Sequence, residues 1–195
     1  MKKLQEFVQK LEEYKPYNSQ EEVDKKAMLE VLNQFGKNIF DRSSSLMHMT
    51  SSAIVLNEEK NKVLFAYHLI YNSYAWLGGH ADGEIDLFKV AIKEVKEETG
   101  LKNIYYDSDN IASIEILPVF AHMKRGQLVP NHLHLNVTYL FTASEKEDVV
   151  IKPDENSSIK WIPIEELDKY VKEKDMMKIY KKIISKALKY KTEFH

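Results

Sequence analysis

The chain contains no cysteine among its 195 residues. This absence excludes a disulfide framework, a zinc site built from thiolates and a cysteine nucleophile. Any metal chemistry must therefore use oxygen or imidazole ligands, which points towards Mg²⁺ or Mn²⁺.

A long apolar segment is also missing. No stretch approaches the roughly 18 apolar residues that a membrane span requires. Residues 1–14 mix charged with apolar side chains and lack the apolar core of a signal peptide, so we expect a cytoplasmic protein. The formal net charge of -2 gives no general attraction to a nucleic acid polymer or to an anionic membrane, and neither is expected as a partner.

Glycine is scarce, and its placement is uneven. The chain has six glycines, of which Gly78, Gly79 and Gly83 fall in one short segment. Glycine permits backbone shapes that other residues avoid, and it lets a backbone approach a ligand closely. A helix is predicted over 86–99, directly after this loop, and Gly100 ends it.

Three carboxylates share one face of that helix. Glu94, Glu97 and Glu98 lie at positions i, i+3 and i+4, which places their side chains near one another. A solvated acidic face is the ordinary explanation for such a cluster. The glycine loop favours a metal site instead, because clustered carboxylates and a backbone carbonyl supply the oxygen ligands that hard divalent cations require. A cation there would bind a diphosphate and align a water for attack.

The remaining pattern predicts strands interleaved with helices. We expect a helical N-terminal extension over residues 1–45, with a second helix that begins after an N-cap at Ser19, and one domain over residues 46–195. The extension has too little core to fold alone, and it is expected to pack on the domain as a homodimer contact or as a lid. The predicted strands are 53–56, 63–68, 114–120, 133–141 and 159–162, and the later helices are 165–171 and 176–189. This order predicts an α/β fold with a mixed sheet covered by helices.

The segment 78–101 resembles the signature of the Nudix hydrolases. That signature runs Gly, five residues, Glu, seven residues, Arg-Glu, an aliphatic residue, any residue, Glu-Glu, any residue, Gly and an aliphatic residue. Gly79 fits its first position. Its end is matched by the run Lys93-Glu94-Val95-Lys96-Glu97-Glu98-Thr99-Gly100-Leu101. The run Gly-Gly-His-Ala-Asp-Gly over 78–83 is similar to one branch of the family.

Two positions depart from the signature. Ile85 stands where the isolated glutamate is usual, with Glu84 and Asp86 beside it, and Lys93 replaces the arginine. In the family these two positions commonly pair and brace the loop against the helix. We therefore expect a shifted brace between Glu84 and Lys93, without the bidentate fork of arginine. Asp86 also suits the N-cap of the helix.

The resemblance implies an α/β/α sandwich and a metal-dependent pyrophosphohydrolase, in which water attacks a nucleoside diphosphate linked to another group. It implies that Mg²⁺ or Mn²⁺ is held by Glu94, Glu97, Glu98 and the carbonyl of Gly79, with Glu97 and Glu94 catalytic. Glu155 is the alternative general base, although it equally suits an exposed turn. The alternative function is a non-catalytic module that binds a nucleotide or ADP-ribose. ADP-ribose, nucleotide sugars, dinucleoside polyphosphates and damaged nucleoside triphosphates all stay open as substrates.

Histidines are the candidates for substrate binding. Alternation along residues 131–141 puts His132 and His134 on one face of a predicted strand, where they either contact phosphate or base or face solvent. His80 follows the Gly-Gly pair, and a position lining the cleft is favoured over a hydrogen bond that braces the loop. A zinc site from His132 and His134 is not expected, because no third soft ligand is obvious near them.

Three further features favour structural roles. Trp76 suits the core better than stacking on a base. Residues 124–126 are expected to form a hairpin turn. The lysine-rich segment 172–191 is expected to present a solvated helix face.

Overall fold

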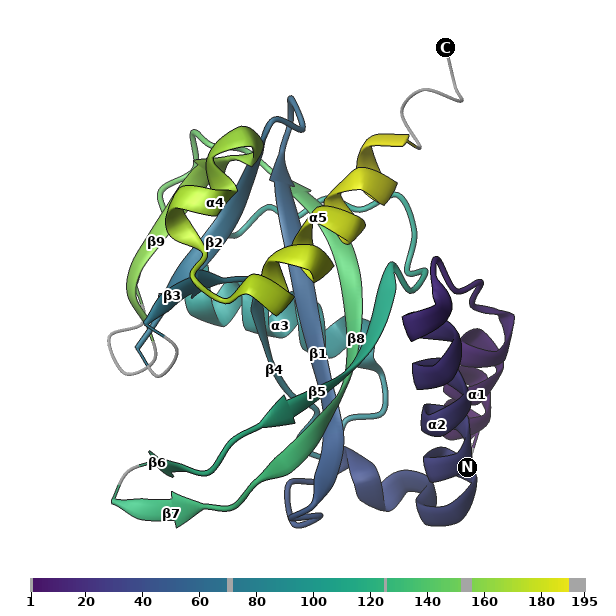
Figure 1. Cartoon of the computed structure of the whole chain (residues 1–195). Helices are drawn as coiled ribbons and strands as arrows, with labels where there is room; N and C mark the ends of the chain where they lie inside the picture. Colours follow the sequence, from purple (N-terminus) through teal and green to yellow (C-terminus); the bar gives the residue numbers. More distant parts are fainter. Residues whose placement is uncertain (1, 70–71, 125, 152–155, 190–195) are drawn as a thin grey trace.

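A mixed sheet of seven strands forms the centre of the computed structural model (Figure 1), which describes residues 2–69, 72–124, 126–151 and 156–189. Five strands follow the order β3-β2-β1-β8-β5, while β4 pairs with β1 and β9 pairs with β2. Strands β1 and β8 run parallel, and the other pairs of this sheet run antiparallel. The strands are β1 (Met47–Asn57), β2 (Lys62–His68), β3 (Ser73–Ala75), β4 (Leu77–His80), β5 (Ser113–Val119), β8 (His132–Ala143) and β9 (Asn156–Pro163). The predicted mixed sheet is confirmed.

Side chains of β1 alternate between two hydrophobic clusters on opposite faces of the sheet. Met49 and Val55 belong to the cluster that includes the apolar side of helix α3 (Leu87–Thr99). Ile54 belongs to the cluster that includes helix α5 (Lys174–Lys189). In Figure 1, α5 lies in front of the strands and α3 behind them. The chain thus forms the α/β/α sandwich that the sequence predicts.

Strand β1 begins at Met47, well before the predicted start at residue 53. Its first half contains polar residues, and yet it is buried. Two hydroxyls explain why burial is tolerated, since Ser51 Oγ donates to the Leu87 carbonyl at 2.6 Å and Ser52 Oγ donates to Asn136 Oδ1 at 2.8 Å. Ser51 faces α3, whereas Ser52 faces the opposite side of the sheet.

Helix α3 has the boundaries that its cap residues predict. Asp86 is the N-cap, and its Oδ1 accepts a hydrogen bond from the Lys89 amide at 3.2 Å. Gly100 ends the helix in the left-handed conformation at φ 73°, which glycine adopts without strain. The three glutamates therefore occupy the last two turns of a helix with fixed ends.

Two helices and a short 3-10 helix precede the sheet: α1 (Lys2–Glu13), α2 (Ser19–Phe35) and η1 (Gly36–Phe40). The predicted N-cap at Ser19 is wrong. Asn18 has the extended backbone of a cap, and its Oδ1 accepts from the Glu21 amide at 2.9 Å, so Ser19 is already helical.

The N-terminal helices share the core of the sheet. Phe7, Leu11, Met28 and Leu32 are buried in the same cluster as the apolar side of α3. Figure 1 shows α1 and α2 beside β5, and α2 contacts that strand. The predicted packing of the extension on the sheet is confirmed.

Helix α5 does not present only a solvated lysine face. Lys182 Nζ lies 2.6 Å from Glu21 Oε1 and 2.8 Å from Glu115 Oε1, with side chains that are 10 %, 0 % and 4 % exposed respectively. The expectation for the lysine-rich segment is wrong here, because α5 packs across the sheet and meets acidic groups of α2 and β5. This ion cluster connects the N-terminal helices to the C-terminal helix.

The remaining elements are a hairpin and two short helices. Strands β6 (His122–Lys124) and β7 (Gln127–Val129) pair antiparallel, which confirms the predicted hairpin. The short helices are η2 (Ile164–Glu166) and α4 (Leu167–Tyr170). Arg125 and the candidate base Glu155 lie outside the described residues. Among those that are described, no helix is long and apolar enough to cross a bilayer.

Candidate functional site

The Gly-Gly pair of β4 lies directly against two carboxylates of α3. The Gly78 amide donates to Glu98 Oε1 at 2.8 Å. A Cβ added to Gly79 would lie 2.6 Å from Glu94 Cδ, closer than real Cβ contacts, so any larger residue at this position would displace the carboxylate. Both glutamates are buried, at 9 % exposure for Glu94 and 6 % for Glu98. The structure thus brings Gly79 and two of the three predicted metal ligands together.

Glu97 is the most accessible of the three glutamates. Its side chain is 44 % exposed, compared with 11 % for that of Glu94. Lys93 Nζ lies between them, 3.3 Å from Glu94 Oε1 and 3.7 Å from Glu97 Oε1. Partial burial opposes the charge of Lys93, but the two carboxylates outweigh it and raise the pKa of this lysine. Lys93 therefore offsets part of the repulsion within the acidic cluster.

The predicted brace between Glu84 and Lys93 is replaced by other contacts. Glu84 Oε1 accepts from the Asp86 amide at 3.1 Å, which lowers the pKa of Glu84. Its ion pairs are with Lys3 at 3.3 Å and Lys89 at 3.7 Å. The physical reason is local, because Glu84 turns towards the start of α3 whereas Lys93 lies two turns further along that helix.

The loop is braced instead from the N-terminal side. Arg42 makes a bidentate contact with Asp82, from Nε to Oδ1 and from Nη2 to Oδ2, each at 2.6 Å. The Gly83 amide donates to the Phe40 carbonyl at 2.8 Å. Ile85, which replaces the usual glutamate, packs against the core. Arg42 was not predicted from the sequence. The absence of arginine at position 93 was the signal that a bidentate arginine contact could come from another segment.

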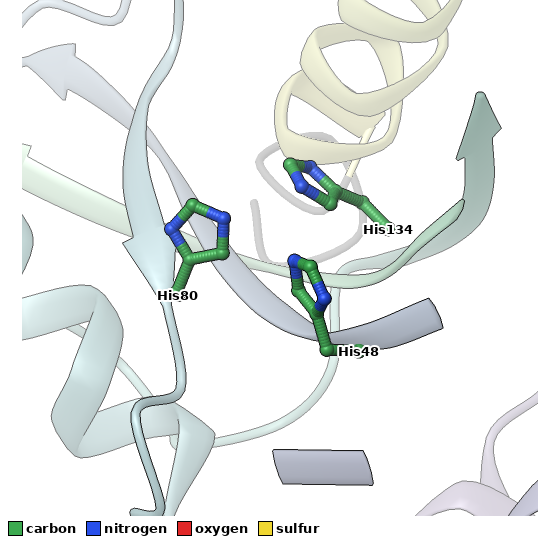
Figure 2. Close-up of side chains that lie close together, drawn as sticks. All are labelled: His48, His80 and His134. Atoms are coloured by element: carbon green, nitrogen blue, oxygen red, sulfur yellow. The ribbon is translucent and has the colours of Figure 1, made fainter. Parts of the chain in front are cut away.

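Four histidines gather on the other face of the sheet. The rings of His48, His80 and His134 (Figure 2) have centroids 5.0 Å from one another in each pairing. The His132 ring lies 5.0 Å from that of His48. Within the described ranges, His48, His80 and His134 are the one group of three or more acidic or histidine side chains whose ligand atoms all lie within 4.8 Å of one another. Of the three glutamates, Glu94 and Glu97 share Lys93, and Glu98 accepts from the Gly78 amide.

Strand register creates this histidine cluster. His48 of β1 lies directly opposite His134 of β8, and His80 of β4 lies opposite Thr50, two residues further along β1. The predicted alternation along residues 131–141 is confirmed, because His132 and His134 share a face. Neither is exposed to solvent as a surface residue would be, since His132 is buried and His134 is half-buried. The sequence reasoning missed His48, which lies in a segment with no apolar strand pattern.

Two imidazoles of the cluster each have one ring nitrogen within hydrogen-bond distance of a backbone carbonyl oxygen. His48 Nδ1 lies 3.1 Å from the Ser44 carbonyl oxygen, and His132 Nδ1 lies 2.9 Å from that of Pro130. His48 Nε2 is buried and has no hydrogen-bond partner. Burial is the main cause that lowers the pKa of His48, and the neighbouring His132 acts in the same direction. Both effects favour the neutral form of the His48 ring.

Other concave and aromatic features lie away from the acidic cluster. A cavity of about 800 Å³ is lined by residues of α1, α5 and the segment 106–112, and by none of the predicted site residues. Trp76 is half-buried, with its ring 5.3 Å from that of Tyr180 in the core. The expected core position of Trp76 is confirmed. The site is thus identified by its side chains.

Comparison with known proteins bears on this arrangement. Residues 47–186 match the model of the NUDIX domain family. The fold is similar to that of an Ap4A hydrolase from C. elegans, at 18 % identity and a TM-score of 0.52, covering 75 % of this chain and 98 % of that one. A NUDIX family hydrolase from Clostridium perfringens is 22 % identical, with a TM-score of 0.49 and coverage of 71 % and 96 %. No curated protein matches the chain.

Proposed function

Because the chain belongs to the NUDIX domain family, and so is a hydrolase of phosphoric anhydride bonds, we propose that it is a metal-dependent pyrophosphohydrolase. The proposed substrate is a nucleoside diphosphate linked to another group, and water attacks its diphosphate. One observation carries the proposal: the Gly78–Gly79 backbone lies against the carboxylates of Glu98 and Glu94, so close that a Cβ at position 79 would displace the Glu94 carboxylate.

The donor set fits a hard divalent cation. Glu94, Glu97 and Glu98 would hold Mg²⁺ or Mn²⁺ together with the carbonyl of Gly79, which are oxygen ligands of the type that these ions prefer. The close approach of Gly79 to Glu94 supports this assignment, because it leaves the strand backbone and the carboxylate side by side. When bound, the cation would neutralise phosphate charge and lower the pKa of a water molecule.

The glutamates differ in what they are able to do. Glu98 accepts a hydrogen bond from the Gly78 amide and is buried, which suits a fixed ligand. Glu97 is the most exposed, so it is best placed to accept the proton of the attacking water. Glu94 contacts Gly79 and Lys93, and in the proposal it positions the ligands and assists catalysis. Glu155 stays the alternative base.

The histidines are proposed to contact the substrate. His80 follows Gly79 directly, and His132 and His134 lie within its ring cluster. Imidazoles that adjoin the glycine pair would meet the phosphates or the group linked to them. The polar sheet face around Asn136 supports this, because it continues from the histidines without an apolar break.

The test is hydrolysis of a panel of nucleoside diphosphate derivatives with Mg²⁺, detected as phosphate after phosphatase coupling. Ap4A belongs in the panel because the fold is similar to that of an Ap4A hydrolase. We expect Glu98→Gln to lower turnover about 100-fold or more while the melting temperature stays within a few degrees, since the amide oxygen still accepts from Gly78. Glu59→Gln, on an exposed turn, is the matched control.

Two outcomes would contradict the proposal. Wild-type turnover in Glu98→Gln would rule out the proposed role of the Glu98 carboxylate as a metal ligand. If the wild-type protein hydrolyses no compound of the panel but is thermally stabilised by one of them, the protein is instead a module that binds a nucleotide or ADP-ribose.

A further inference from the structure

We propose that His48, His80 and His134 form a binding site for one divalent transition metal ion, separate from the carboxylates of α3. Their ligand atoms lie within 4.8 Å of one another, and the rings converge from three different strands (Figure 2). The three histidines are far apart in the sequence, and strand pairing brings them together. His134 of β8 lies opposite His48 of β1, and His80 of β4 lies opposite Thr50, two residues further along β1.

The spacing is close to that of a coordinated set. Zinc binds imidazole nitrogen at about 2.0–2.1 Å, so the nitrogens of a tetrahedral site lie about 3.3 Å apart. The ligand atoms, at most 4.8 Å apart, are therefore within about 1.5 Å of this spacing. His80 and His134 are half-buried, whereas His48 is buried.

Hydrogen bonds orient the ligand nitrogens. The Ser44 carbonyl accepts only from an N–H, so it fixes the proton of His48 on Nδ1 and leaves the lone pair on Nε2. That Nε2 atom is buried without a partner, which is costly for a polar group unless something binds it. Histidine ligands of metals characteristically donate their other ring N–H to a carbonyl in this way.

His132 extends this support to a second ligand. Its Nδ1 donates to the Pro130 carbonyl, which leaves Nε2 as an acceptor 3.1 Å from His134 Nε2. His134 therefore donates from Nε2, and its lone pair is on Nδ1. His132 is thus a positioning residue that sets the tautomer of His134.

The ligand chemistry selects the class of metal. Three imidazoles and no carboxylate suit Zn²⁺, Co²⁺ or Ni²⁺, whereas Mg²⁺ prefers oxygen ligands. Three protein ligands leave a fourth position for an oxygen of solvent or of a bound molecule. The prediction that no third soft ligand lies near His132 and His134 is wrong. The sheet brings His48 and His80 beside them from other strands.

The two sites share no side chain and lie on opposite faces of the sheet. Gly79 faces Glu94 on the α3 side, and the next residue, His80, points to the other face because side chains alternate along a strand. Ser51 of β1 bonds to Leu87 on the α3 side, while Thr50 bonds to Asn136 beside the histidines. The two proposed metal sites therefore share no ligand, although His80 and His134 are also among the proposed substrate contacts.

The test is a Co²⁺ titration of the full chain without a histidine tag, in excess Mg²⁺ to occupy oxygen ligands. Visible d–d absorption and calorimetry report the binding. We expect one equivalent to bind with absorption bands of low-coordinate Co²⁺. His80→Gln and His134→Gln should each weaken binding about 100-fold or more, since even the loss of an orienting partner costs 10–100-fold.

Two control variants separate the sites. His122→Gln changes a neighbouring histidine whose ring lies 6.5 Å from that of His132, and it should bind Co²⁺ as the wild type does. Glu98→Gln should lose turnover and keep Co²⁺ binding, so failure of one proposal is visible without the other. Wild-type affinity in both His80→Gln and His134→Gln, or loss of binding in Glu98→Gln, would overturn the proposal.

Discussion

Replacement of Gly79 by alanine tests the contact between β4 and α3. The new Cβ would lie 2.6 Å from Glu94 Cδ and 2.7 Å from Glu94 Oε2, whereas ordinary contacts begin at 3.4 Å. The carboxylate must therefore move by close to 1 Å. It is the far end of a flexible side chain, so this movement costs the fold little. A displacement of about 1 Å at a reacting centre lowers the rate about 100-fold, or about 2.7 kcal/mol of transition-state stabilisation.

The assay is kcat/KM on the substrate that the panel identifies, with thermal unfolding measured on the same samples. Gly83→Ala is the matched control in the same loop. Its Cβ meets nothing within 4 Å, but its φ of 87° strains an L-residue. We expect Gly83→Ala to lower the melting temperature more than Gly79→Ala does and to keep more of the activity.

The opposite ranking would refute the reasoning. If Gly79→Ala is folded and retains activity within about threefold of the wild type, the position of the Glu94 carboxylate does not control turnover. If Gly79→Ala is instead severely destabilised, the Glu94 side chain is held too rigidly to move. The expectation that its displacement costs the fold little stability is then wrong.

Three further predictions concern metal, capping and pH. Chelation should abolish turnover and added Mg²⁺ should restore it, measured in the same coupled assay. Asn18→Ala should cost about 1 kcal/mol in denaturant unfolding and Ser19→Ala much less, because Asn18 is the N-cap. Glu21→Gln should cost about 3 kcal/mol near neutral pH, since it breaks a buried pair with Lys182. Burial opposes the charge of Glu21, but its hydrogen-bond donors lower its pKa below 4.5, so the stability difference should shrink as pH falls through that lowered pKa.

The carboxylate helix was predictable because its determinants are local. The i, i+3, i+4 spacing of Glu94, Glu97 and Glu98 and the terminal residues Asp86 and Gly100 all lie within one helix. The mixed sheet and its two covering helices also followed from apolar periodicity. What failed at this level was fine detail, such as a cap displaced by one residue to Asn18.

Contacts between distant segments were not predictable in the same way. Arg42 reaches Asp82 and Lys182 reaches Glu21 only because separate elements pack together. A lysine on an amphipathic helix has the same sequence pattern whether it faces water or a buried carboxylate. Periodicity therefore gives the face of a helix but not the partner that the face meets.

The order Gly79-His80 shows how one short strand serves two faces of the sheet. On the α3 side, a Cβ at residue 79 would displace the Glu94 carboxylate, so glycine keeps that carboxylate in place. One residue later the chain points to the opposite face, where His48 and His134 lie across the sheet, and an imidazole fits. The observed position of the Glu94 carboxylate therefore depends on the glycine, while strand pairing determines which side chains the histidine contacts. A shift of β4 by one residue would place an imidazole against Glu94 and remove it from the cluster, so both proposed sites depend on the same register.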